Sequence, residues 1–207
     1  MNLLISTFFA GLIVSFLGTL PPGVLNVTVT RITLRQGQWS ALGFVLACGL
    51  VEFVYSYLAV LITQLVVQNG VIRYLTDGLT AAVLLGMGVY YLRKPVAIPT
   101  EHQHKTHPFK LGILLSLLNL AAFPFWTIYT ALLIQKGWVS LMSPSEMIIY
   151  VTGIAIGTLL GLWVFVWLSS WVRQLLANYY HRIDQLTGLL LVGLSVVQCL
   201  VWLVNPL

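Results

Sequence analysis

The sequence has very little charge. Only 7% of its 207 residues are Asp, Glu, Lys or Arg, whereas about 25% is usual for a soluble domain, and 59% are hydrophobic. The few charges are clustered and leave four uncharged stretches, at residues 1–30, 111–135, 147–172 and 185–207. These stretches exclude an ordinary soluble protein and predict membrane spans, since each span needs about 20 mostly apolar residues.

Motifs for nucleotide hydrolysis, redox chemistry and metal binding are also missing. No G-x-x-x-x-G-K-[ST] loop occurs, so ATP-driven transport within this chain is not expected. Cys48 and Cys199 form no C-x-x-C pair and are predicted to be small buried side chains. His102, His104 and His107 lack the cysteine or fourth ligand of a closed zinc site. We therefore predict no cofactor and no metal site, with metal binding by these histidines kept as an alternative.

The apolar segments predict six membrane-spanning helices. Their approximate limits are 3–27, 40–63, 73–92, 110–134, 147–170 and 184–204. Because β-type alternation is absent from them, helices are the favoured structure. The spans hold no histidine and no nucleophile–base pair, so we predict no catalytic residue and a protein that is not an enzyme. The expected fold class is an all-α polytopic membrane protein.

Positive charges are distributed unevenly among the predicted connections. The first, third and fifth connections hold eight of the ten: Arg31, Arg35, Arg93, Lys94, Lys105, Lys110, Arg173 and Arg182. The other two, Arg73 and Lys136, lie in even-numbered connections. Because Lys and Arg collect in cytoplasmic loops, we expect both termini outside the cytoplasm. The net charge of +5 then reflects topology, and we predict no nucleic-acid partner. The first span has no positive n-region, so we expect it to be retained.

Six spans suggest a three-plus-three repeat, the common plan of secondary transporters. Polar and glycine positions of the third span recur 107 positions later in the sixth: Asp77, Thr80 and Gly86 match Asp184, Thr187 and Gly193. We predict two inverted three-helix repeats, at 1–93 and 110–207, joined by a cytoplasmic linker at 94–109. Asp77 and Asp184 are each expected to begin a helix as caps, with a gating role as the alternative.

Two predicted spans contain helix-breaking residues at similar depth. Proline removes a backbone donor and clashes with the preceding turn, and glycine lets the chain turn away. Broken helices in both halves point to a substrate site at the membrane midplane. The predicted substrate-binding residues are Pro21, Pro22, Gly23, Asn26, Asn119 and Pro124. For the two asparagines, interhelical hydrogen bonding is the alternative.

Glu52 lies in a run of 37 residues, between Arg35 and Arg73, that holds no other charge. A charged group at the centre of a span costs about 2.5–3.5 kcal/mol on insertion scales and usually marks a functional site. We predict that Glu52 couples transport to protons. Two alternatives stay open: a structural acid bonded to a neighbouring helix, and a counter-charge for a substrate amine.

Three glycines of the fifth span, Gly153, Gly157 and Gly161, lie four residues apart and therefore on one helix face. Small residues at this spacing let two helix backbones approach closely. We expect a structural role for them, with a sliding surface as the alternative.

The chain resembles the lysine-exporter (LysE/RhtB) superfamily of bacterial transporters over nearly its whole length. The stretch from Gly18 to Asn26, GTLPPGVLN, is similar to the proline-glycine-proline-asparagine motif of the family's first helix. Val24 stands in place of the second proline. Asn119 matches the asparagine of the family's asparagine-proline-lysine-alanine motif, although the proline and lysine are absent here. Gly43 and Gly49 match glycines of the second span.

The resemblance implies a secondary transporter of the bacterial cytoplasmic (inner) membrane. It would export an amino acid or a similar small metabolite. Alternating access and proton coupling through Glu52 are our predictions from the broken helices and the lone acid, since Glu52 is not part of the family's motif. Its partners would be the small-molecule substrate, protons and the lipid bilayer, and a homo-oligomer is left open. Two other functions stay open: a divalent-cation exporter, although a lone carboxylate suits hard cations poorly, and a non-transporting membrane module.

Overall fold

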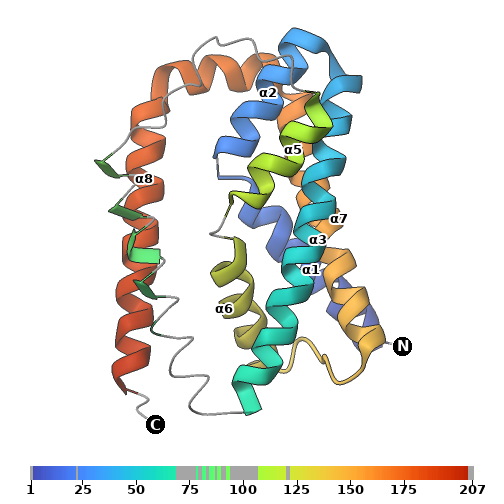
Figure 1. Ribbon diagram of the computed structural model, residues 1–207, viewed down its shortest axis with the longest axis vertical. Coiled ribbons are helices and arrows are strands. Elements are labelled where there is room, and N and C mark those ends of the chain that lie inside the picture. Colours follow the sequence, from blue (N-terminus) through green and yellow to red (C-terminus); the bar gives the residue numbers. More distant parts are fainter. Residues whose placement is uncertain are drawn as a thin grey trace.

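All regular structure in the described part of the chain is helical. The computed structural model describes residues 2–21, 23–68, 78, 81–82, 84–86, 88–89, 92–93, 107–119 and 122–204. The helices, labelled as in Figure 1, are α1 (Asn2–Thr19), α2 (Val24–Gln36), α3 (Gln38–Gln68), α5 (Pro108–Leu117), α6 (Ala122–Gln135), α7 (Pro144–Trp167) and α8 (Ser169–Val204). The predicted all-α class is therefore confirmed for these residues.

The first predicted span is broken, as its prolines require. α1 ends at Thr19 and α2 begins at Val24, with a bend of 75° between them. Neither Pro21 nor Pro22 has an N–H group with which to continue the α1 ladder. At the far end of α2, Gly37 adopts φ 85°, which a residue with a side chain rarely adopts, and lets α3 start immediately.

The fourth predicted span is broken as well, between α5 and α6. The N–H of Asn119 donates to Ser116 O, and the N–H of Ala122 donates to Asn119 O, each over 3.1 Å. These i to i+3 bonds tighten the chain into turns. Pro124 does not make this break, contrary to expectation, because α6 has already begun at Ala122. In the first turn of a helix the missing N–H of proline has no partner to lose.

Length and composition identify fewer complete spans than the six predicted. Two helical segments of the described residues are long and apolar enough to cross a membrane: Gln38–Gln64 and Pro144–Trp167. The bent pair α1 and α2 would make a third. Shorter apolar segments occur at Pro108–Leu117, Phe125–Gln135 and Leu191–Leu200. Six spans, the inverted repeats and their boundaries at 1–93 and 110–207 therefore stay predictions.

Two sequence predictions concern the remaining polar segments. Most of the linker at 94–109, with His102 and His104, lies outside the described residues, as do Asp77 and Thr80. Asp184 lies well inside α8 and does not begin a helix, so the prediction that it caps one is wrong. No glycine or proline interrupts the chain from 169 to 187, and the helix continues through this position.

α1 packs closely along α7, and glycines make this approach possible. A Cβ atom at Gly161 would lie 2.7 Å from the Thr19 Cβ atom, and one at Gly157 would lie 2.7 Å from the Ser15 Cβ atom. A Cβ atom at Gly153 would collide with the Phe8 carbonyl group. The predicted close approach at these three glycines is confirmed, and their partner is α1.

The core is divided into two clusters. One gathers Phe44, Val45, Leu162 and other residues of α2, α3 and α7. The other gathers Trp126, Tyr150 and other residues of α3, α6 and α7. In Figure 1, α3 and α7 run along the length of the molecule and contribute to both clusters.

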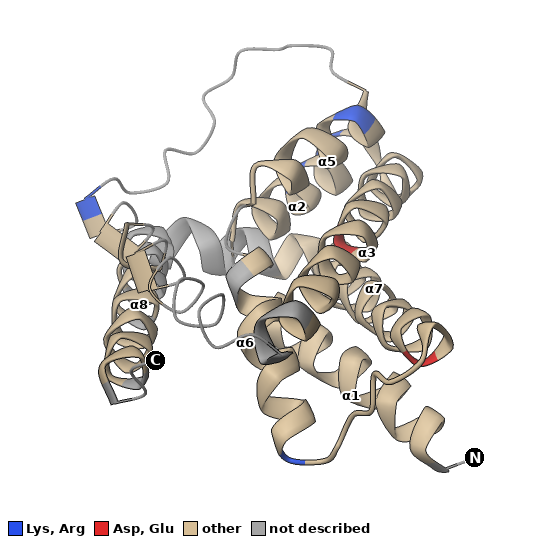
Figure 2. Cartoon of the chain, turned by 60° about the horizontal axis from the view of Figure 1, so that its bottom comes forward, with Lys and Arg blue, Asp and Glu red and all other residues tan. Residues whose placement is uncertain are grey.

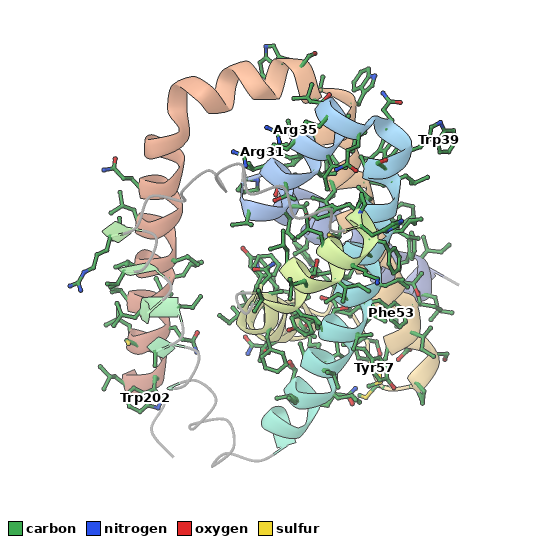
Figure 3. The ribbon with its side chains drawn as sticks, turned by 45° about the horizontal axis from the view of Figure 1, so that its top comes forward. Arg31, Arg35, Trp39, Phe53, Tyr57 and Trp202 are labelled. Carbon is green, nitrogen blue, oxygen red and sulfur yellow. The ribbon has the colours of Figure 1, made fainter. Side chains whose placement is uncertain are left out.

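Charged and aromatic residues mark the ends of the helices. In Figure 2, Lys and Arg lie near helix ends, whereas Glu52 is the only charged residue in the sequence of α3. Figure 3 shows Trp39 projecting outward from the start of α3, at the end of the molecule where Arg31 and Arg35 lie on α2. The Trp39 side chain is 86% exposed. An exposed tryptophan beside basic residues is typical of a membrane interface.

Candidate functional site

A cavity of about 340 Å³ lies where the two helix breaks meet α3. The first break contributes Pro21, Gly23 and Asn26, the second contributes Asn119, and α3 contributes Glu52. Five of the predicted site residues therefore share one cavity, although Pro21 and Asn119 are 98 positions apart in the sequence. Such volumes are at the small end of ligand sites, which usually measure about 300–1,000 Å³.

Glu52 is held in the cavity wall by a hydrogen bond from α6. The indole N–H of Trp126 donates to Glu52 Oε1. Trp126 is only 1% exposed, and the ring of Phe125 meets it edge-on, with centroids 5.0 Å apart. A buried indole N–H requires an acceptor inside the protein, and Glu52 provides one. The carboxyl group therefore has a fixed position at the cavity surface.

Asn26 bridges the first break. Its Nδ2 atom donates to the carbonyl oxygen of Thr19 over 2.7 Å, which joins the start of α2 to the end of α1. The Thr19 hydroxyl donates to Ser15 O over 2.8 Å, and the hydroxyls of Ser15 and Thr158 lie 2.8 Å apart. This polar chain runs along the cavity wall from α2 through α1 to α7. The structural alternative for Asn26, a hydrogen bond between helices, thus describes one of its contacts.

Asn119 occupies the corresponding place at the second break. Its side chain is partly buried at the cavity wall, and its backbone N–H and C=O groups form the turns between α5 and α6. The phenol of Tyr55, on α3, donates to Leu117 O over 2.6 Å and ties the end of α5 to the helix that carries Glu52. Both breaks are therefore fixed by side-chain hydrogen bonds to backbone carbonyl groups.

Helix ends give the cavity two electrostatic poles. Gly23, the residue before α2, provides no side-chain cap, so the first N–H groups of α2 lack an acceptor from such a cap. Helix N-termini carry partial positive charge and C-termini partial negative charge. The starts of α2 and α6 thus favour an anionic group, whereas the end of α1 and Glu52 favour a cationic one. Leu17 O accepts from Leu20 N at 3.3 Å because Pro21 cannot donate to it.

Two predicted site residues are not placed in the cavity. Pro22 lies outside the described residues, and the side chain of Pro124 is not described. Among the described residues, no group of three or more His, Cys, Asp and Glu side chains could hold a metal ion. The cavity wall instead contains several neutral polar groups and aromatic rings.

Sequence reasoning did not predict several polar and aromatic residues of the cavity wall, among them Ser15, Phe125, Trp126 and Thr158. One signal for Trp126 was available. A tryptophan inside a predicted span needs an acceptor. Glu52 is the only carboxylate within the predicted spans apart from Asp77 and Asp184, which lie near span ends. Ser15, Phe125 and Thr158 carry no comparable sequence signal, because apolar spans contain many hydroxyl and aromatic residues that only pack.

Comparison with known proteins confirms the resemblance seen in the sequence. No curated protein and no solved structure shows significant similarity to the chain. A family model described as "LysE type translocator" matches residues 7–200, which include both helix breaks, Glu52 and the cavity. The family is one of transporters rather than enzymes, and the apolar helices agree with a membrane location. The chain is therefore a membrane protein that belongs to the LysE type translocator family.

Proposed function

We propose that this translocator is a secondary exporter of an amino acid or a similar small metabolite. Substrate would bind in the cavity between the two helix breaks and leave by alternating access. The observation that carries this proposal is the meeting of both breaks with Glu52 in one cavity. Broken helices that meet near the midplane are a recurring substrate site of secondary transporters.

The two poles of the cavity support a substrate with both an amine and a carboxylate. A carboxylate would lie near the N–H groups at the start of α2, where Gly23 provides no competing side-chain cap. An amine would lie near Glu52 and the carbonyl groups at the end of α1. The cavity of about 340 Å³ favours a molecule of amino-acid size over a large metabolite.

Proton coupling is proposed to depend on Glu52. An ionised Glu52 would hold the substrate amine, and protonation from the outside would remove that attraction and release the substrate outward. The Trp126 N–H would stay bonded to Oε1 in both states, because a protonated carboxyl group keeps an acceptor oxygen. Export of one substrate would then be linked to proton entry.

A ligand-dependent thermal-unfolding screen would test the proposal. The purified protein would be heated with amino acids, polyamines and divalent cations at pH 6 and pH 8. We expect stabilisation by one amino-acid class, and we expect Glu52→Gln to reduce it and remove its pH dependence. Glu146→Gln is the matched control, because Glu146 caps the start of α7 and does not line the cavity.

Three outcomes would contradict parts of the proposal. Stabilisation by divalent cations alone, lost in Glu52→Gln, would indicate a cation exporter. An unchanged pH profile in Glu52→Gln, measured as export from proteoliposomes, would exclude coupling through this residue. A protein that no compound stabilises, and that transports none in proteoliposomes, would favour a non-transporting module.

A further inference from the structure

We propose that Phe125, whose ring contacts Gly18, sets an upper limit on the size of a substrate that binds beside Glu52. This inference rests on the proposed function, since it names the size limit of the same cavity. Phe125 comes from α6 and Gly18 from α1, and both line the cavity. The pair thus closes one side of the space between the two helix breaks.

The ring of Phe125 points tip-first at Gly18. A Cβ atom at Gly18 would lie 2.9 Å from Phe125 Cζ and 3.6 Å from both Cε atoms. Equal distances to the two Cε atoms place the ring edge symmetrically over position 18. A contact of 2.9 Å is too short for carbon atoms, which are best separated by about 3.5–4.0 Å. A side chain at position 18, three residues before Pro21, would therefore displace the tip of the Phe125 ring.

Neighbouring aromatic rings hold Phe125 in this orientation. Trp126 meets it edge-on at 5.0 Å, and Tyr129 lies against it at 4.5 Å with a tilt of 37°. Trp126 also donates to Glu52. The group that anchors the substrate and the ring that limits it are thus fixed relative to each other. A substrate that binds Glu52 must end before the ring of Phe125.

Substitutions at these two positions should change the size limit in opposite directions. Phe125→Leu shortens the side chain and enlarges the cavity, so longer ligands should gain affinity relative to shorter ones. In Gly18→Ala the new methyl group displaces the Phe125 ring from its present position, so longer ligands should lose affinity. In the double variant the shorter leucine removes the clash, and the preference for longer ligands should return.

The test is a competition series of straight-chain L-amino acids that differ by one methylene. The neutral series runs from alanine to norleucine, and the basic series from 2,3-diaminopropionate to lysine. We expect each single variant to change the affinity ratio between adjacent members about tenfold or more, since one methylene in an apolar site discriminates about 10–200-fold. A uniform loss across the series would overturn the inference, because it would make Phe125 a packing residue.

Two control variants separate size selection from general damage. Gly43→Ala adds a methyl group at a helical position with no atom within 4 Å of the new Cβ. Trp163→Leu removes an aromatic ring of α7 that is not part of the cavity wall. Neither should reorder the two series. If Gly43→Ala reorders them as Gly18→Ala does, the contact with Phe125 is not the cause.

A second measurement does not depend on the substrate class. Asn119→Cys, in a chain with Cys48→Ala and Cys199→Ala, places a thiol at the cavity wall, where methanethiosulfonates of increasing size can react. Gly18→Ala should slow the larger reagents selectively, and Phe125→Leu should speed them. If no amino acid binds but this size dependence is found, the proposed substrate class fails and the inference stands. Equal changes for all reagents would overturn the inference.

Discussion

At the scale of single residues, the pair of Glu52 and Trp126 brings an acidic group and a buried donor together in an apolar region. The carboxyl group gains a hydrogen-bond donor, and the buried indole N–H gains an acceptor. An unsatisfied buried polar group costs about 1–3 kcal/mol. The pair therefore stabilises the fold as well as positioning the acid.

Trp126→Phe removes the donor and keeps an aromatic ring. We expect the free energy of unfolding to fall by about 1–3 kcal/mol, because Glu52 loses its hydrogen-bond partner. In a Glu52→Met background the same substitution should cost less or be stabilising, since the indole N–H would already lack its acceptor. Denaturant titration in detergent of all four proteins measures this coupling.

Trp163→Phe provides the surface control for this cycle. Trp163 lies on α7 and is 38% exposed, so its substitution should change the free energy of unfolding little and equally in both backgrounds. Additive effects of Trp126→Phe and Glu52→Met would show that the two side chains do not stabilise each other.

At the scale of helices, the first break is held by Asn26. Asn26→Leu removes its hydrogen bond to Thr19 O, and we expect a loss of about 0.5–1.5 kcal/mol or more, because the α1 carbonyl group is left without this donor. Thermal unfolding would measure the loss. Thr30→Val is the matched control on α2, since among the described residues the buried Thr30 hydroxyl bonds within its own helix, to Asn26 O. Equal losses in both variants would show that the hydrogen bond across the break stabilises the protein no more than one within α2.

The contact of α1 with α7 depends on glycine. Gly157→Ala would place a Cβ atom 2.7 Å from Ser15 Cβ and 2.9 Å from Phe16 N. We expect the two helices to be forced apart at a cost of about 1–3 kcal/mol, read as a lower thermal midpoint. Gly43→Ala has open space around the new atom and should stabilise α3 by about 0.5–1 kcal/mol. A Gly157→Ala protein as stable as the native one would contradict this packing.

At the scale of the whole molecule, charge distribution predicts orientation. Gln36 is exposed at the end of α2, near Arg31 and Arg35, whereas Met142 is 94% exposed before the start of α7. We expect a membrane-impermeant maleimide to label Met142→Cys on intact cells, and Gln36→Cys only after permeabilisation. Both variants would carry Cys48→Ala and Cys199→Ala. The opposite pattern would invert the predicted topology and place both termini in the cytoplasm.

Much of the fold was predictable from local chemistry. Scarcity of charge indicates a membrane protein wherever the helices finally pack, and the first helix must break because Pro21 and Pro22 lack an N–H group in any environment. The stretch from Gly18 to Asn26 already identifies the family. Glu52 is conspicuous because a lone acid in an apolar span is costly. The site could thus be outlined from individual residues.

Other features were decided only by contacts between distant parts of the chain. Trp126 lies 74 positions after Glu52, and no local pattern shows that their side chains meet. Phe125 and Gly18 likewise become a pair only when the start of α6 comes near the end of α1. Asp184 was expected at a helix start, but α8 continues through it. Sequence by itself determined the membrane location, the all-helical class and the break between α1 and α2, because scarcity of charge and the missing N–H of proline act locally. Only the tertiary structure decided which side chains share the cavity, because that depends on how separate helices pack.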